Sequence, residues 1–225
     1  LFLMAATPSF DRKTLIATLG EWARQRLAPA KADLAQSFLK AYFHRVPSAD
    51  LAQSDPEALY TRALAHLDLA EQRQPGQLLL RTNNPAEAQT AQASPFTVVE
   101  AVVDDMAFLV DSASMVLNRL GYTIHLTIHP VVKVSRDENG RLTALNHDAA
   151  DATVESFLCF HISREVRAER LDHIVSELAR VLSEVSAAND DRIAMRELAL
   201  SLADDLDIPD VSEDGDARSE ARALC

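Results

Sequence analysis

Residues 104–125 read DDMAFLVDSASMVLNRLGYTIH, and the hydrophobic period changes twice within this stretch. Starting from Leu109, apolar residues recur at i, i+4, i+7, i+8 and i+11, which predicts a helix over 107–120 with one face in the core. Gly121 stands where a helix ends in left-handed geometry. The preceding residues 96–103 have the composition of a buried strand. The stretch therefore predicts a strand, a helix and a second strand in succession.

The second strand has the clearest alternation in the chain. Apolar residues stand at even positions from Tyr122 to Val134, and the polar residues that alternate with them are Thr123, His125, Thr127, His129, Lys133 and Ser135. This period of two predicts one core-facing and one polar sheet face. A turn at Asn139-Gly140 then leads to a short strand over 141–145.

The remaining pattern completes a β-α-β-β-α order. We predict a strand over 154–162, an amphipathic helix over 171–185 and a further helix over 191–206. Right-handed crossovers place both helices of the unit on one sheet face, as in ferredoxin-like α/β sandwiches with an antiparallel sheet. The fold class is therefore α+β. The usual fourth strand is missing after the second helix, and we expect residues 77–81, QLLLR, to fill that edge.

The first 75 residues read as three helices. Ser9 or Asp11 is placed to cap a helix that runs to about Leu27. Pro29 suits the first turn of a second helix, and Asp55-Pro56 starts a third. We therefore divide the chain into a helical segment (1–75), the βαββα domain (76–188), and a helical extension with an acidic linker (189–225). The final DARSEARALC is helix-forming without a cap, so we expect the chain to continue into a downstream region.

Composition limits the class of protein. With 225 residues, 48% of them apolar, the chain is able to bury a substantial core. Its net charge of −12 opposes binding to nucleic acid, and no apolar run is long enough to span a membrane. Two cysteines, Cys159 and Cys225, give no disulfide framework, so we expect a reducing, cytoplasmic compartment.

No motif amounts to a catalytic or metal site. The doublet Asp104-Asp105 has the position of a helix cap, and a metal site there would need further hard ligands. His125 and His129 imitate a chelating pair, but on a strand they lie about 13 Å apart at ~3.3 Å per residue. Cys159 lies on the same strand face as His161. The sequence around them offers no general base with a second group to orient it, so we expect a buried structural thiol.

Cofactor binding is not predicted for this chain either. Its glycines are isolated and form neither a phosphate loop nor a dinucleotide fingerprint. We assign no catalytic, cofactor-binding or metal residues.

The polar sheet face is the candidate interface. Its residues are Thr123, His125, Thr127 and His129, which are polar but carry no charge when the imidazoles are neutral. Such side chains are desolvated at modest cost when they are hydrogen-bonded. We therefore predict that the N-terminal helices, a second subunit or a later domain covers this face.

The stretch FTVVEAVVDDMAFLVDSASMVLNRLGYTIHLTIHPVVKVSRDENGRL resembles the N-terminal region of the large bacterial NAD-specific glutamate dehydrogenases. That family has a D-x-P-F-L-V-D-S-x-x-x-x-L-x-x-x-G-Y-x-I-H run. It is matched here by Asp105, Phe108, Leu109, Val110, Asp111, Ser112, Leu117, Gly121, Tyr122, Ile124 and His125. The family's proline is Ala107 here. SFLCFHISREV is also similar, and the resemblance covers most of residues 75–190.

The resemblance implies a first ACT-like domain, a ferredoxin-like module used for sensing amino acids or for assembly. It implies a parent enzyme that deaminates glutamate oxidatively to 2-oxoglutarate, with NAD as cofactor in downstream domains. Partners would then be those domains and other copies of the parent, a homo-oligomer. ACT sites that bind amino acids usually have a glycine in the first strand-to-helix loop, where this chain has DDMA. The leading hypothesis is therefore a non-catalytic N-terminal regulatory or assembly segment of an NAD-dependent glutamate dehydrogenase. The runner-up is a free-standing ACT-like module for amino-acid sensing or dimerisation, and an independent enzyme comes third.

Overall fold

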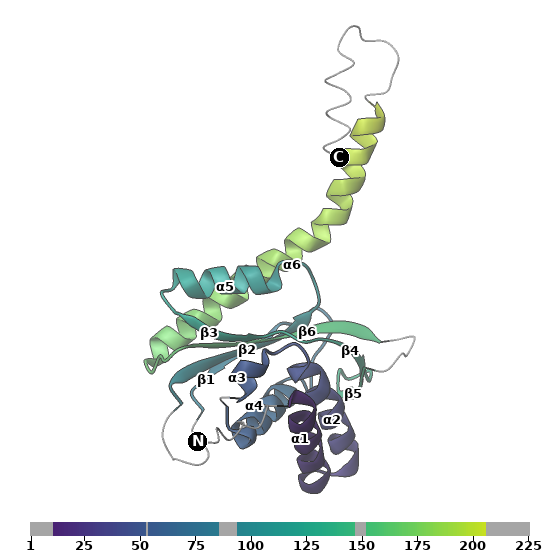
Figure 1. The fold of residues 1–225 in the computed structure, drawn as a ribbon. Coiled ribbons are helices and arrows are strands. Elements are labelled where there is room, and N and C mark those ends of the chain that lie inside the picture. The colour runs from purple at the N-terminus through teal and green to yellow at the C-terminus, as the bar shows by residue number, and fades with distance from the viewer. Residues whose placement is uncertain (1–10, 53, 86–93, 147–151, 206–225) are drawn as a thin grey trace, which may run out of the picture.

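An antiparallel sheet separates two layers of helices (Figure 1). The structure, a computed structural model, describes residues 11–52, 54–85, 94–146 and 152–205. Within these ranges the helices are α1 (Arg12–Arg26), α2 (Pro29–Phe43), α3 (Ser48–Ala52), α4 (Pro56–Leu69), α5 (Leu109–Arg119) and α6 (Ala168–Asp205). The strands are β1 (Leu79–Asn83), β2 (Phe96–Asp104), β3 (Ile124–Ile128), β4 (Val131–Arg136), β5 (Leu142–Leu145) and β6 (Thr153–Ser163).

The N-terminal helices begin where their capping residues predict. The Asp11 carboxylate accepts hydrogen bonds from the backbone N–H groups at the start of α1, and Asp55 caps α4 in the same way. Pro29 is the first residue of α2. The sequence prediction of three helices missed the short α3, and the alternative cap Ser9 lies outside the described residues.

The sheet has the strand order β1-β2-β6-β4-β5, and β3 pairs with β6 beyond β4. β6 is therefore central: β2 lies along one edge, and β3 and β4 lie in succession along the other. β1 pairs antiparallel with β2, with Leu79 opposite Val102. The prediction that a strand from the N-terminal side fills the outer edge is confirmed, two residues later than expected. The α+β, ferredoxin-like fold class is also confirmed.

The segment after α5 is not one regular strand. The register shifts between Ile124 and Leu126, which places an extra residue, His125, in the edge strand. A bulge of this kind moves the following side chains to the opposite sheet face. Ile124 accordingly packs with α5 and α6, whereas Leu126 and Ile128 pack with the N-terminal helices. The prediction of one apolar and one polar face along this segment was wrong for this reason.

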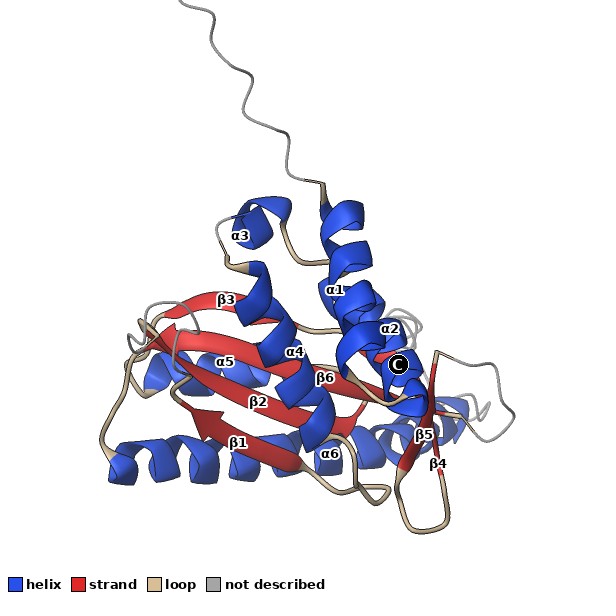
Figure 2. Cartoon of the chain, turned by 90° about the horizontal axis from the view of Figure 1, so that it is seen from below, coloured by secondary structure: helices blue, strands red, loops and turns tan. Residues whose placement is uncertain are grey.

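Each sheet face has its own core. Figure 2 shows α1, α2 and α4 on one side of the sheet and α5 and α6 on the other. The first core includes Phe38, Leu39, Phe43, Val98, Val132 and Phe157, and the second includes Leu109, Leu117, Leu158, Phe160, Ile162 and Ile174. The N-terminal helices therefore cover one face of the sheet, and α5 and α6 cover the other.

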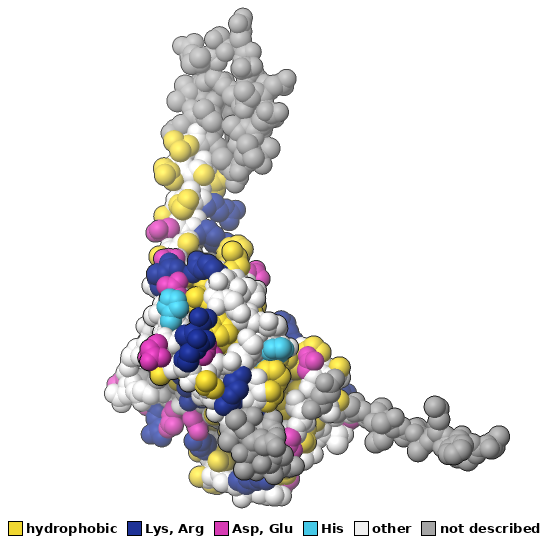
Figure 3. Space-filling view, turned by 90° about the vertical axis from the view of Figure 1, so that its left-hand side faces the viewer, with side chains coloured by type: hydrophobic (Ala, Val, Ile, Leu, Met, Phe, Trp, Pro, Cys, Tyr) yellow, Lys and Arg dark blue, Asp and Glu magenta, His cyan; other side chains and the backbone are white. Residues whose placement is uncertain are grey.

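α6 is a single helix of 38 residues, so the prediction of two helices here was wrong. No glycine or proline interrupts residues 168–205, so nothing within this range breaks the helix. Its first half packs on the sheet, but its second half projects away and exposes Met195, Leu198 and Leu202 (Figure 3). Among the described residues, no helix is long and apolar enough to cross a membrane.

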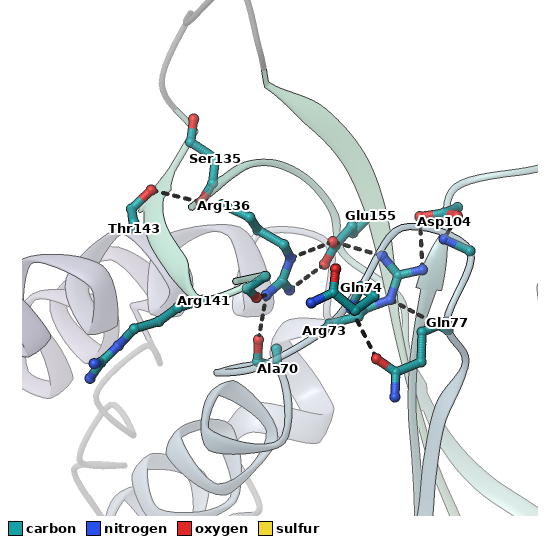
Figure 4. Close-up of polar contacts among 12 residues, drawn as sticks. Ala70, Arg73, Gln74, Gln77, Asp104, Ser135, Arg136, Arg141, Thr143 and Glu155 are labelled. Carbon is teal, nitrogen blue, oxygen red and sulfur yellow. Dashed lines mark hydrogen bonds and ion pairs between the residues drawn. The ribbon is translucent and has the colours of Figure 1, made fainter. Parts of the chain in front are cut away.

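A buried carboxylate, Glu155 of β6, joins the helical layer to the sheet (Figure 4). Its Oε1 lies 2.8 Å from Arg73 Nη1 and 2.8 Å from Arg136 Nε, and its Oε2 accepts a 2.8 Å hydrogen bond from Arg136 Nη2. Arg73 follows α4, and its Nη2 lies 2.7 Å from Asp104 Oδ1 at the end of β2. Two cations thus neutralise two carboxylates at this junction.

Backbone carbonyls complete the network. Arg73 Nε donates to the Gln77 carbonyl at 2.6 Å, and Arg136 Nη1 donates to the carbonyls of Ala70 and Gly140. Gly140 has φ +83°, and a Cβ there would lie 2.5 Å from the Arg73 carbonyl oxygen. The turn at Asn139-Gly140 therefore needs glycine both for its conformation and for close approach to the chain after α4.

Glu155→Gln should lower the free energy of unfolding by about 3 kcal/mol, because two arginines would lose the charge that compensates them in the interior. Denaturant unfolding followed by circular dichroism measures the change. The matched control is Glu71→Gln, which removes the same charge from an exposed pair with Arg141 and should cost under about 1 kcal/mol. Equal losses in the two variants would contradict a structural role for the buried network.

Candidate functional site

The four residues of the predicted interface face do not lie on one face. Thr123 and His125 are exposed, and Thr127 and His129 are half-buried. The His125 ring contacts Phe96, with ring centroids 4.8 Å apart, and Phe96 stacks on His161. Burial lowers the pKa of His161 to about 4. The bulge at His125 therefore separates the first pair from the second.

His129 belongs to a chain of hydrogen bonds that ends on the acidic doublet. Its Nε2 lies 3.0 Å from Ser156 Oγ, and Ser156 Oγ donates to Asp105 Oδ1 at 2.5 Å. Since a carboxylate only accepts, the serine proton points to Asp105, and His129 donates to the serine. His129 is then not a base for Ser156, and these three residues do not form a nucleophilic triad. Burial lowers the pKa of His129.

The doublet Asp104-Asp105 does not cap α5, which corrects the sequence interpretation. Asp104 accepts from the Gly76 backbone N–H and pairs with Arg73, whereas Asp105 accepts from Ser156. The N-cap position is Phe108, with φ +69° and no side-chain cap. Both acids instead hold neighbouring segments at the end of β2.

A buried polar cluster lies between α2, α4 and the sheet, and sequence reasoning missed it. His66 Nε2 lies 3.1 Å from the Ala101 carbonyl oxygen, and its Nδ1 lies 3.2 Å from the Tyr42 hydroxyl. Because the carbonyl only accepts, Nε2 carries the proton and Nδ1 accepts from Tyr42. Burial lowers the pKa of His66 to about 3, so the ring is neutral. The cluster therefore forms a hydrogen-bonded part of the core.

Two further groups complete this cluster. Glu100 Oε2 accepts from Arg81 Nε at 2.7 Å and from Asn83 at 3.2 Å, and burial raises the pKa of Glu100. Burial also raises the pKa of the Cys159 thiol to about 12, as expected for an inert buried thiol. Cys225 lies outside the described residues.

His66, Glu100 and Cys159 are the described residues whose types and proximity suit a metal, with ligand atoms within 4.8 Å of one another. However, His66 Nδ1 already accepts from Tyr42, and Arg81 neutralises Glu100. A metal would also require the thiol to lose its proton. The cluster fits a hydrogen-bonded core better than a metal centre.

The comparisons with known proteins identify the family. Residues 38–178 match the family model described as glutamate dehydrogenase, ACT1 domain. The chain belongs to the glutamate dehydrogenase ACT1 family. It is 31% identical over 200 residues to the NAD-specific glutamate dehydrogenase of Halomonas elongata, covering 87% of this chain and 12% of that protein. It is 30% identical over 151 residues to that of Pseudomonas aeruginosa, covering 66% of this chain and 9% of the relative.

The ACT1 match includes both helical layers, because residues 38–178 run from α2 into α6. The sequence motif around Gly121-Tyr122 has a structural role in this ACT1 chain. The Tyr122 hydroxyl donates to Glu165 Oε2 at 3.0 Å and lies 2.9 Å from Arg170 Nε. Glu165 also pairs with Arg167, which holds the pKa of this carboxyl well below its usual range. These contacts fix the start of β3 against the start of α6.

The buried imidazole should make the stability depend on pH. His66 has a folded pKa of about 3 against an ordinary value of 6.5, so between these values the unfolded chain binds a proton that the folded chain does not. Stability should therefore fall as the pH falls through this window, by up to about 1.4 kcal/mol per pH unit for this group.

Denaturant unfolding at several pH values measures this slope. His66→Gln removes the titrating ring and should reduce the slope, whereas His173→Gln, which replaces an exposed histidine on α6, should leave it nearly unchanged. Identical slopes for the wild type and His66→Gln would show that this ring does not titrate as inferred.

Chelators should leave the melting temperature unchanged, because the polar cluster is satisfied by its own hydrogen bonds. Calorimetry before and after dialysis against EDTA, together with elemental analysis of the untreated protein, measures this. A stoichiometric metal whose removal lowers the melting temperature, and whose content is lost in Cys159→Ser, would contradict our interpretation.

Proposed function

We propose that this chain is a non-catalytic regulatory and assembly segment of an NAD-dependent glutamate dehydrogenase. The observation that carries the proposal is the ACT1 match over 38–178 in a chain that spans only 12% and 9% of its two relatives. Most of the length of such relatives lies outside the matched region, which leaves space there for catalytic domains. ACT-like modules are used for sensing or assembly, and this role fits a domain with two well-packed cores.

The geometry of the described residues supports a non-catalytic role. The Ser156 hydroxyl donates a hydrogen bond to Asp105 rather than to His129, and Cys159 is a buried thiol with a raised pKa. Neither side chain is an activated nucleophile. The described titratable clusters are explained by packing and ion pairing, so no residue is assigned to catalysis.

The turn between β2 and α5 also does not fit a binding site for NAD. A dinucleotide site needs a glycine-rich turn between a strand and a helix N-terminus. Between β2 and α5 this chain has DDMAF, without glycine, and Phe108 stands at the N-cap. We therefore place NAD in downstream domains of the parent and derive no step of the reaction from this chain.

The proposal extends to the reaction and assembly of the parent enzyme. Its reaction would be the oxidative deamination of L-glutamate to 2-oxoglutarate, with NAD accepting the hydride. We propose that the parent is a cytoplasmic homo-oligomer without nucleic-acid or membrane partners. In this scheme the segment comprises the helical part (1–75), the ACT-like domain (76–188) and an extension (189–225) that leads to the downstream domains.

Glutamate-dependent NAD reduction tests the proposal. The purified chain should give no turnover, whereas the intact parent should be active. Deleting the segment from the parent should change its mass in solution or its response to amino-acid effectors. Turnover by the chain that survives repurification would overturn the non-catalytic role. A native reading frame that ends at Cys225 would instead favour the free-standing ACT-like module.

A further inference from the structure

A groove of about 590 Å³ lies where the end of α2 meets the bend between β3 and β4. It is lined by the last turn of α2 and the residues that follow it, by residues 127–131, and by Asn146 after β5. The helical layer and the sheet therefore each supply one wall.

The charged side chains that line this groove are both cations, Lys40 and Arg45. Among the described residues, neither has an ion-pair partner, and no aspartate or glutamate lines the groove. His44 and His129 also line the groove, and the His129 ring is hydrogen-bonded to Ser156. In a chain with a net charge of −12, this arrangement creates a local positive potential that attracts an anion.

The other lining residues favour an organic anion over a bare inorganic one. Val46, Ile128 and Pro130 are apolar and would contact a carbon skeleton, whereas Thr127 and Asn146 add polar groups to the lining. An arginine fork matches a carboxylate bidentately, and a lysine supplies a second positive charge. Two cations beside an apolar wall suit a short carbon chain with a negative charge at each end.

We propose that this groove binds a small organic dicarboxylate, with Arg45 and Lys40 pairing with its two carboxylates. A free amino acid of the same length is a poorer ligand, because its ammonium group would meet two cations and no carboxylate partner. The groove therefore selects dicarboxylates without an amino group. Binding of this kind is a property of the chain itself and does not depend on the activity of the parent.

Calorimetric titration with succinate, aspartate and inorganic phosphate tests the proposal on the full chain at low ionic strength. Succinate and aspartate share a carbon skeleton and differ in the ammonium group. Succinate should bind in a saturable manner, at least about tenfold more tightly than aspartate or phosphate, and should weaken as salt screens the exposed cations. No saturable binding of succinate up to about 10 mM, or equal binding of all three, would overturn the proposal.

Charge-neutralising variants locate the binding. Arg45→Gln and Lys40→Gln should each weaken succinate binding by about 10-fold or more, as expected for hydrogen bonds to charged groups. Both residues are exposed, so the melting temperature should change little. Arg192→Gln makes the same charge change on the projecting end of α6 and should leave binding unchanged. If all three variants bind succinate like the wild type, or lose affinity equally, the dicarboxylate is not held in this groove.

Discussion

The carboxylate of Glu155 is the point on which the two layers of the protein depend. It is buried in the central strand, and its two arginines come from the segment after α4 and from the end of β4. Removing a carboxylate from water is costly unless opposite charge and hydrogen bonds surround it. Both arginines are needed to compensate the buried carboxylate, so the helical layer and the sheet must pack together for the network to form.

Local signals in the sequence were sufficient for much of the fold. Asp11, Pro29 and Asp55 mark helix starts because a cap acts within one turn of the chain. The spacing of apolar residues in α5 and the edge position of β1 were also predictable, since period and strand count are properties of short segments. Apart from the short α3 and the undivided α6, the helices and most strands were therefore found within a few residues of their bounds.

The features that were missed depend on contacts between distant segments. The bulge at His125 is invisible in an alternating pattern, because either register looks regular until the partner strand is known. Arg73 and Glu155 are 82 residues apart, and nothing near either one shows that both are buried. The doublet Asp104-Asp105 had the position of a cap, yet it serves other partners, because Arg73 and Ser156 compete successfully for its oxygens.

Only the strand residues of the candidate groove were predictable, because the groove also depends on contacts between distant segments. Thr127 and His129 attracted attention as polar strand residues, and both line the groove. Sequence analysis did not single out Lys40 and Arg45, because only the packing of α2 on the sheet places them opposite the strand residues. Likewise, His66 gave no sign of its burial, because one histidine in an amphipathic helix is equally typical of either face.

The place of β1 in the sheet has a mechanical consequence. Because β1, a strand from the N-terminal side, already occupies the outer edge of the sheet, that edge needs no later strand, and α6 continues beyond the domain. The helix from residue 190 to residue 205 extends about 24 Å at 1.5 Å per residue. A tilt of α6 on the sheet by about 5° would displace the far end of this rod by about 2 Å. The closed edge thus gives the domain a lever arm, in which a small rearrangement of the packed half becomes a larger movement at a distance.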